Sequence, residues 1–466
     1  MTSSLVWLRN DLRLDDNAAL AAALAAGKNV LVLYILDEAM GAAARWWLHH
    51  SLSALAADLQ ARGAALVLRQ GIAAKIIPEL AAEIGAGSVH VAASFTPALR
   101  RQDQALETAL RRRGIPLQQH PSASLFAPGQ IRTRTGGFYG VYGPFAKACF
   151  EAGVPEDFCP SPAQIPAVTG VKTDRLEDWN LVPRHPDWAA GLRESWTPGE
   201  AGAQTRLRAF LAGPVQNYAA TRDYPGIAGT SKLSPHVHFG EISPRRLWHA
   251  AVAAGPGEGV KKFLGELLWR EFSINLLWQH PTLRKEPIRQ EFAAMPWRRD
   301  AQALRAWQRG RTGIPIVDAG MRELCQTGWM HNRARMICAS FLTKHLLLPW
   351  QDGEKWFWDT LCEADEAANG ASWQWVAGCG ADAAPYFRVF NPVLQARKYD
   401  ADGAYVRRYV PELALLPDKA IHAPWEAEAK TLAQAKVELG KTYPLPIVSL
   451  SEGRERALAA YARITS

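Results

Sequence analysis

The sequence predicts a mixed architecture: an α/β domain with a doubly wound, mostly parallel sheet at the N-terminus, followed by a larger all-α domain. Short aliphatic runs alternate with alanine- and leucine-rich stretches up to about residue 120, which is the pattern of βαβ units. Beyond residue 200, apolar residues recur mainly at helical spacing. The chain of 466 residues also exceeds what one ordinary core supports, so at least two domains are expected.

The N-terminal domain is placed at residues 1–125. Its strands are predicted at short apolar runs, namely residues 5–8, 30–36, 66–68 and 89–92. The first run is followed by WLRNDLRLDDNAAL and by no GxGxxG, so an ordinary Rossmann dinucleotide site is not supported. The glycine-rich stretch at 255–259 lies between helical patterns and is predicted to be a loop.

Residues 126–200 are rich in proline and glycine and poor in periodicity, which predicts a long connection between the domains. The helical domain is placed at residues 201–466. Within it, Ser234-Pro235 and Ser243-Pro244 each predict a helix start, because serine can cap a helix and proline is accepted in its first turn.

Composition narrows the class of protein. No apolar run reaches the roughly 20 residues that span a bilayer, and the N-terminus lacks the features of a signal peptide. The six cysteines show no CxxC spacing, which predicts reduced thiols and no metal site. We therefore expect a cytoplasmic, monomeric protein that does not bind or span a membrane. The net charge of +8 suits a polyanionic partner, and 18 tryptophans exceed ordinary packing needs.

The segment GTSKLS, residues 229–234, is a candidate phosphate-binding turn. Thr230, Ser231 and Ser234 place hydroxyls and backbone N–H groups ahead of a proline-started helix, which can hold a diphosphate. A plain capping turn is the alternative. His236 and His238 follow, and without a third ligand nearby they are expected to be structural.

In ELLWREF, helical spacing puts Glu266, Trp269 and Arg270 within one turn of each other. This group predicts a surface that recognises a base. The alternative is a core tryptophan beside a surface ion pair. In WMHNRARM, Asn332 and Met336 share a helix face between arginines. This pattern fits a nucleobase next to phosphates, or a basic surface helix.

The segment that begins LCEADEAANGASWQW carries a third candidate. Glu363 and Asp365 precede Asn369, which lies one helical turn from Trp373. Acids and an amide can bond the edges of a flavin and tune its redox state. The alternative is an acidic helix start followed by core tryptophans.

In their order and spacing these motifs resemble the photolyase/cryptochrome family, and most closely its class I cyclobutane pyrimidine dimer photolyases. The resemblance rests on VWLRNDLRLDDNAAL, GTSKLS, ELLWREF, MPWRRD, WMHNRARM and ASWQWVAGCGADAAPYFRVFNP, and extends from Leu5 to about Pro446. It implies FAD in the helical domain. The implied contacts are Tyr218, Thr230, Ser231, Lys232, Leu233, Ser234, Phe263, Arg270, Glu363, Asp365 and Asn369.

The resemblance also implies an activity: light-dependent repair of cyclobutane dimers in UV-damaged DNA by electron transfer from photoexcited FADH⁻, with the dimer flipped into the site. Glu266 would hydrogen-bond the dimer. The other implied lesion and DNA contacts are Trp269, Asn332, Met336, Trp375, Arg222, Arg333 and Arg388. A photoreduction chain would run from Trp373, nearest the flavin, through Trp350 to Trp297, nearest solvent.

Alternatives within the family stay open. A cryptochrome-like blue-light receptor is disfavoured by Asn369 and by the absence of a disordered tail, and a (6-4) photolyase by Asn332 and Met336, where that branch places histidines. A folate antenna is doubtful because Ala98-Leu99 stand where folate-type relatives carry Asn-Glu. The segment RWWLHHSL, residues 45–52, could lie near a deazaflavin or flavin antenna or simply pack into the domain, and an empty antenna site is also allowed.

Overall fold

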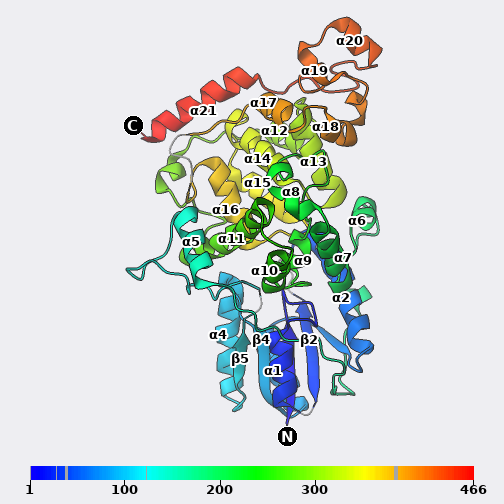
Figure 1. Cartoon of the computed structure of the whole chain (residues 1–466), viewed down its shortest axis with the longest axis vertical. Helices are drawn as coiled ribbons and strands as arrows, with labels where there is room; N and C mark the ends of the chain where they lie inside the picture. The colour runs from blue at the N-terminus through cyan, green and yellow to red at the C-terminus, as the bar shows by residue number, and fades with distance from the viewer. Residues whose placement is uncertain (1, 28, 37–39, 122, 383–386, 466) are drawn as a thin grey trace. The chain divides into compact units, whose positions relative to one another are not determined.

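The computed structural model describes residues 2–27, 29–36, 40–121, 123–382 and 387–465 (Figure 1). The chain forms two compact units. The first unit comprises Met1–Gln216 and Ser231–Pro281, and the second unit comprises Asn217–Thr230 and Thr282–Ser466. No helix among the described residues combines the length and the apolar character needed to cross a membrane.

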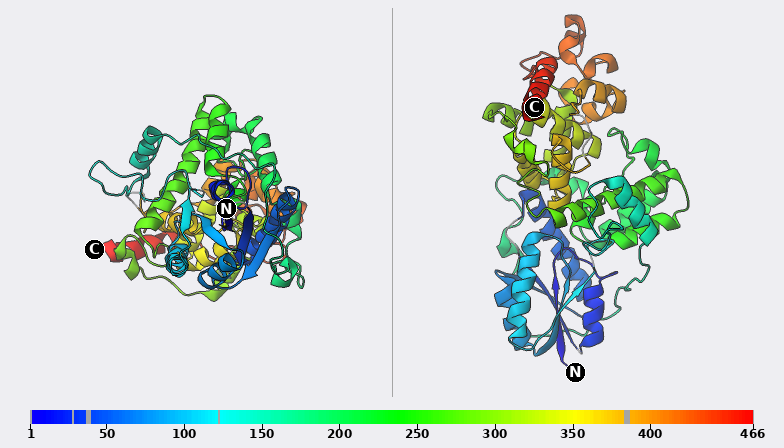
Figure 2. Two further views of the ribbon diagram at one scale, coloured as in Figure 1. Left: turned by 90° about the horizontal axis from the view of Figure 1, so that it is seen from below. Right: turned by 90° about the vertical axis from the view of Figure 1, so that its left-hand side faces the viewer.

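A five-stranded parallel sheet with the strand order β3-β2-β1-β4-β5 is the centre of the first unit. Its strands are β1 (Ser3–Leu8), β2 (Val30–Leu36), β3 (Leu66–Gln70), β4 (Ala86–Ala92) and β5 (Leu117–His120). Crossover helices connect them: α1 (Ala18–Ala26), α2 (Ala42–Gln60), α3 (Ala73–Glu83) and α4 (Pro97–Arg111). Helices cover both faces of the sheet (Figure 2). The predicted doubly wound α/β fold is confirmed.

The central strands are apolar because both of their faces are covered. Every residue of β2 is buried, and Leu5, Leu33 and Val89 pack in one core cluster. The strand β5 was not predicted from the sequence. The two central residues of LQQH are exposed and the two outer ones are partly exposed, and the strand pairs with β4 at the edge of the sheet.

The remaining helices of the first unit include two, α5 and α6, within the predicted interdomain connection. Helix α5 packs on α11 through ring contacts between Tyr142 and Trp269 and between Phe145 and Phe272. The bounds of these helices are α5 (Tyr142–Ala152), α6 (Ala190–Ser195), α7 (Glu200–Leu211), α9 (Ser234–His238), α10 (Pro244–Ala253) and α11 (Glu258–Gln279), while α8 (Pro214–Thr221) crosses the boundary between the units.

The two predicted serine-proline helix starts differ. Ser243 caps α10, since its side chain accepts a hydrogen bond from Arg246 N at 3.0 Å. The expectation that Ser234 caps a helix is wrong. Leu233 already has helical dihedral angles and holds the N-cap position of α9, so Ser234 is the first residue inside the helix.

The second unit is helical, as predicted for the C-terminal half. Its core cluster contains the buried tryptophans Trp307, Trp350 and Trp373. The bounds are α12 (Ala301–Gln308), α13 (Pro315–Thr327), α14 (Asn332–Ser340), α15 (Trp350–Thr360), α16 (Glu366–Ala377), α17 (Pro392–Tyr399), α18 (Ala404–Tyr409), α19 (Asp418–Ile421), α20 (Ala429–Gln434) and α21 (Leu450–Thr465).

Candidate functional site

A buried polar network in the second unit fixes the amide of Asn369 on α16. Its Nδ2 donates to the backbone oxygen of Glu354 at 3.1 Å and to Glu354 Oε1 at 2.9 Å. Arg284 Nε lies 2.6 Å from the same carboxylate oxygen, and the Arg284 guanidinium lies 3.5 Å from the ring centroid of Trp358. Because Glu354 uses the Nδ2 group, the amide oxygen of Asn369 is the atom that could accept from an N–H donor of a ligand.

Two predicted flavin contacts precede Asn369, and both have protein partners. Glu363 is buried and forms an ion pair with Arg335. Asp365 is the N-cap of α16, and its Oδ1 accepts hydrogen bonds from Ala367 N at 2.9 Å and Ala368 N at 2.8 Å. Asp365 thus forms the acidic helix start that was its alternative interpretation. A carboxylate has about four lone-pair sites, so two such bonds are compatible with a further ligand contact.

The predicted DNA-contacting residues Arg222 and Arg333 meet at Asp223. Arg333 NH2 lies 2.9 Å from Asp223 Oδ2, and Arg222 Nε lies 4.0 Å from Asp223 Oδ1. The Arg222 guanidinium also lies 5.7 Å from the ring centroid of Tyr218, a predicted flavin contact on α8. Two guanidinium groups around one carboxylate leave a local positive charge, which suits a DNA phosphate.

The first turn of α14 brings Asn332 and Met336 together, with Asn332 Nδ2 3.8 Å from Met336 Sδ. His331 is the N-cap residue, and its Nδ1 accepts a hydrogen bond from Arg333 N at 3.1 Å. Burial lowers the pKa of His331 to about 4. The imidazole is therefore neutral at pH 7, as its acceptor role requires.

The tryptophans of the predicted photoreduction chain differ in exposure. Trp373 and Trp350 are buried, whereas Trp297 is half-buried. The absence of a side chain at Gly353 lets Trp373 pack on α15, because a Cβ there would lie 2.1 Å from a ring carbon of Trp373. Trp307 also contacts Trp373, with ring centroids 6.1 Å apart, although the sequence had not singled it out.

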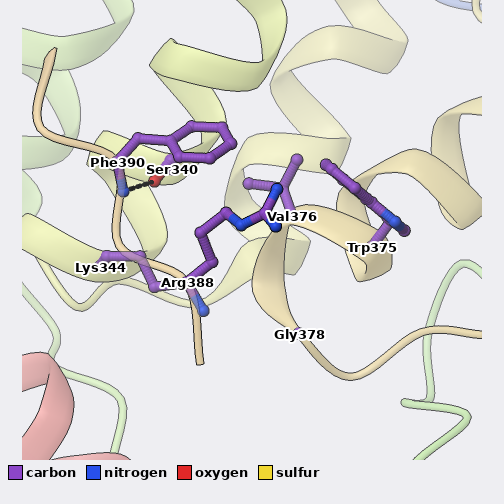
Figure 3. Close-up of a pocket in the computed structure, with 7 residues that line it drawn as sticks. All are labelled: Ser340, Lys344, Trp375, Val376, Gly378, Arg388 and Phe390. Atoms are coloured by element: carbon purple, nitrogen blue, oxygen red, sulfur yellow. Dashed lines mark hydrogen bonds between the residues drawn. The ribbon is translucent and has the colours of Figure 1, made fainter. Parts of the chain in front are cut away.

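Two predicted DNA contacts, Trp375 and Arg388, line one small pocket of about 30 Å³ (Figure 3). Arg388 extends its side chain toward Val376 and the Trp375 side of the pocket. Lys344 is buried at this pocket and donates from Nζ to Ala377 O at 2.6 Å, in the last turn of α16. The other lining residues are Ser340, Gly378 and Phe390.

In the first unit, α11 carries Phe263, Glu266, Trp269 and Arg270. Glu266 Oε1 lies 3.6 Å from Lys262 Nζ one turn earlier, and the two side chains are 25% and 46% exposed. Phe263 is buried with its ring 4.8 Å from that of Phe210.

The other two α11 residues contact segments that precede α11 in the chain. The ring of Trp269 is half-buried and stacks on Tyr142, with 3.6 Å between centroids. Arg270 NH1 donates to Ala123 O at 2.7 Å. The carboxylate, indole and guanidinium predicted to act together therefore lie within one turn of a single helix.

The predicted diphosphate turn is divided between the units: Thr230 belongs to the second, and Ser231 to Ser234 belong to the first. Lys232 has a φ of 51°, so the backbone turns sharply between the two serines. Ser231 Oγ accepts a hydrogen bond from Leu233 N at 3.4 Å. His236 contacts Glu241 through Nδ1, which makes it a structural residue as expected.

The segment at residues 45–52 lies in α2, and its large residues pack into the first unit. Trp46, Trp47 and Leu48 are buried, and Trp47 Nε1 donates to Glu241 Oε1 at 2.9 Å. The packing interpretation of this segment is confirmed. An antenna chromophore near it stays a prediction.

Sequence reasoning missed the residues that hold the site residues in place: Glu354, Arg284 and Asp223. Glu354 stands in WQDGEKWFWDT, where its neighbours are mostly charged and aromatic, so nothing in the local pattern marks it as buried. Its partner Arg284 is 70 residues away. Only the helical spacing from Glu354 to Trp350 and Trp358 hinted that these side chains share a face.

The residue types in both units fit a flavin. The second unit supplies an oriented amide oxygen at Asn369, an aromatic ring at Tyr218 and the carboxylates of Glu363 and Asp365. The first unit supplies the ring of Phe263 and a sharp turn that carries serine hydroxyls and backbone N–H groups. These are the groups that isoalloxazine edges, ribose hydroxyls and a diphosphate require.

Two family descriptions match the chain: "DNA photolyase" at residues 4–165 and "FAD binding domain of DNA photolyase" at residues 263–463. A protein of Agrobacterium fabrum named deoxyribodipyrimidine photo-lyase is 47% identical, with 99% of this chain and 98% of the relative covered. Cryptochrome-1 of Arabidopsis thaliana is 34% identical over 99% of this chain and 70% of its own length.

Among solved structures, a class III photolyase from Agrobacterium tumefaciens is similar, with a TM-score of 0.97 and 47% identity over 100% of this chain and 98% of that one. The sequence motifs predict class I, whereas this similar structure is of class III, and the class I assignment stays a prediction. The match to the FAD binding domain identifies FAD as the cofactor.

Proposed function

Because this chain belongs to the photolyase/cryptochrome family, we propose that it repairs cyclobutane pyrimidine dimers in DNA under blue light. The observation that carries the proposal is the arrangement on α11, where the carboxylate of Glu266 and the indole of Trp269 lie within one helical turn and neither is fully buried. A carboxylate and an aromatic ring at one helical turn can hydrogen-bond and stack on a pair of linked pyrimidines.

When bound, reduced FAD supplies the electron that light delivers to the dimer. The role of Asn369 is to present an amide oxygen in a fixed orientation, which the Glu354–Arg284 ion pair maintains. The buried rings of Trp373 and Trp350 and the half-buried ring of Trp297 provide side chains for electron entry from solvent. This route would serve activation, and repair by chemically reduced protein would not require it.

Photolyases are among the enzymes known to take a base out of the duplex stack, at a cost of a few kcal/mol that is smallest for damaged bases. Asn332 and Met336 would line the lesion pocket, and Trp375 would pack against the extruded bases. Arg222, Arg333 and Arg388 would hold phosphates and make binding salt-dependent.

Two other activities use the same fold. A blue-light receptor is supported by the similarity to Cryptochrome-1, and a (6-4) photolyase differs from the proposed enzyme in its substrate. No contact of the lesion residues favours either alternative. Asn332 and Met336 lie where a (6-4) photolyase is expected to have histidines.

The test is a repair assay with purified, chemically reduced holoprotein. Single- and double-stranded DNA with cyclobutane dimers is illuminated with blue light, and thymine absorbance is followed against a dark control and against (6-4) DNA. We expect light-dependent recovery of absorbance with the cyclobutane substrate only. Recovery with the (6-4) substrate alone, or with neither despite reduced bound FAD, would reject the proposal.

A further inference from the structure

Next to the predicted contact Arg333, the second unit carries a surface of aromatic, aliphatic and basic side chains. We call it the Tyr224 patch and define it as Tyr224, Ile227, Arg333, Lys398 and Tyr399. Tyr224 is 41% exposed and Ile227 is 51% exposed. The rings of Tyr224 and Tyr399 lie edge to face with centroids 6.0 Å apart. The patch thus joins the segment after α8 to the ends of α14 and α17.

Both cations of the patch lie against the ring of Tyr399. The guanidinium carbon of Arg333 is 4.2 Å from the ring centroid of Tyr399, and Lys398 Nζ is 5.0 Å from the same centroid. Asp223 fixes Arg333 through the 2.9 Å ion pair. Aromatic rings between cations make the usual platform for an unpaired nucleobase and its phosphate.

The loop that carries Tyr224 is held in place. Arg408 NH2 donates to Gly226 O at 3.5 Å. A Cβ at Gly226 would lie 3.2 Å from Ala404 Cβ and 3.3 Å from Asp400 Oδ1, so the loop backbone packs closely on the start of α18. The exposed side chains of Tyr224 and Ile227 therefore project from a fixed backbone.

A single exposed apolar side chain is ordinary in a folded protein. Here two lie three residues apart in one short loop beside positive charge, and Arg333 directly follows Asn332, a predicted lesion contact on α14. The patch is therefore continuous with the predicted lesion-binding residues of the second unit. Removing a dimer from a duplex leaves the two bases opposite it without partners, and their exposed faces need an apolar surface.

We propose that the Tyr224 patch binds an unpaired base of the strand opposite the dimer. The inference rests on the proposed function, since it requires a dimer that has left the duplex. Tyr224 supplies the stacking ring, and Arg333 and Lys398 supply charge for the adjoining phosphate. The patch thereby favours the opened duplex over the intact one.

The test compares Tyr224→Ala with wild-type holoprotein on three DNAs that contain the dimer: a duplex, the same duplex with abasic sites opposite the dimer, and the damaged strand alone. We expect Tyr224→Ala to weaken binding to the full duplex about tenfold, within the range measured for single base–aromatic contacts. On the other two DNAs the loss should stay below about twofold, because the base that the ring contacts is missing.

Two variants control for folding. Tyr224→Phe keeps the ring and should bind all three DNAs as wild type does. Trp188→Ala removes an aromatic side chain of similar exposure, 40%, from the first unit and should also bind normally. A Tyr224→Ala loss of equal size on all three DNAs, or no loss on any, would overturn the inference. Wild-type protein that does not distinguish damaged from undamaged DNA would instead overturn the proposed function, and the inference with it.

Discussion

The candidate site residues of α11 in the first unit and those of α16 in the second unit are held by different kinds of contact. On α16, Asn369 is bonded to a buried carboxylate that is itself paired with Arg284. On α11, Glu266 has an ion pair with Lys262 across one helical turn, and both side chains are partly exposed. The hydrogen bonds between Asn369 and Glu354 are buried, whereas the ion pair between Glu266 and Lys262 is partly exposed to solvent.

This difference indicates a division of roles. A side chain in a buried network keeps one geometry before any ligand arrives, which suits a cofactor that stays bound. A solvated ion pair contributes little to stability, so its carboxylate can exchange partners at low cost when a substrate enters. Substitutions in the network around Asn369 should therefore change stability, whereas substitution of Glu266 should change activity.

The largest effect is expected from Glu354→Ala. It removes the partner of both Arg284 and Asn369 and leaves a mostly buried guanidinium without its carboxylate, which costs about 3 kcal/mol. Urea denaturation followed by circular dichroism measures the loss, and absorbance at 450 nm measures FAD content. Glu354→Gln keeps an acceptor for Asn369 and should lose less. Equal stability of Glu354→Ala and wild type would contradict the conclusion that the buried network around Asn369 is held more firmly than the ion pair on α11.

The next effect is expected from Gly353→Ala. The added Cβ would lie 2.1 Å from a ring carbon of Trp373, so α15 or the indole must shift, at about 2 kcal/mol. Light-driven reduction of oxidised FAD should slow at the same time. Gly143→Ala is the matched control, because a Cβ at Gly143 in α5 meets no atom within 4 Å. Normal stability and normal photoreduction in Gly353→Ala would contradict the packing described for Trp373.

A smaller effect is expected from Tyr142→Ala, which removes the ring stacked on Trp269 at 3.6 Å. The loss should be about 1 kcal/mol. Tyr142→Phe keeps the stack and loses only the hydrogen bond to Gly265 O, so it should be closer to wild type. Thermal unfolding of wild type, Tyr142→Phe and Tyr142→Ala measures the order of their stabilities. A Tyr142→Phe variant as unstable as Tyr142→Ala would show that the hydroxyl matters more than the ring.

The smallest effect is expected from Lys262→Ala. The ion pair with Glu266 is partly exposed, so its loss should change the free energy of unfolding by less than about 0.5 kcal/mol. Repair per bound flavin should be unchanged, because the carboxylate of Glu266 is retained. A stability loss above 1 kcal/mol in chemical denaturation would mean that α11 is held as rigidly as α16.

Most of the fold followed from apolar patterning, and the exceptions have physical causes. The buried strands β1 and β2 contain the continuous apolar runs LVWL and VLVLYIL, whereas β5 offers only LQQH, because an edge strand needs little apolar surface. The helices α5 and α6 were missed within a region predicted to be a connection. The predicted boundaries at residues 125 and 200 stay a prediction.

The candidate site was predictable where its residues lie within one or two turns of the same helix. Asn332 with Met336 is a local pair on α14 that the structure brings together, and Glu266 and Trp269 lie within one turn of α11. Asn369 with Glu354 is a pair between two helices, and Arg284 adds a third segment 70 residues away. Such partners depend on packing that one helical period does not encode.

The most direct test of the account is the quantum yield of dimer repair for Glu266→Ala, measured on chemically reduced holoprotein at saturating damaged DNA. We predict wild-type FAD content, an unfolding free energy within about 0.5 kcal/mol of wild type, and a repair yield that falls several-fold. A Glu266→Ala protein that repairs dimers with the wild-type yield would contradict the assignment of the α11 carboxylate to the substrate.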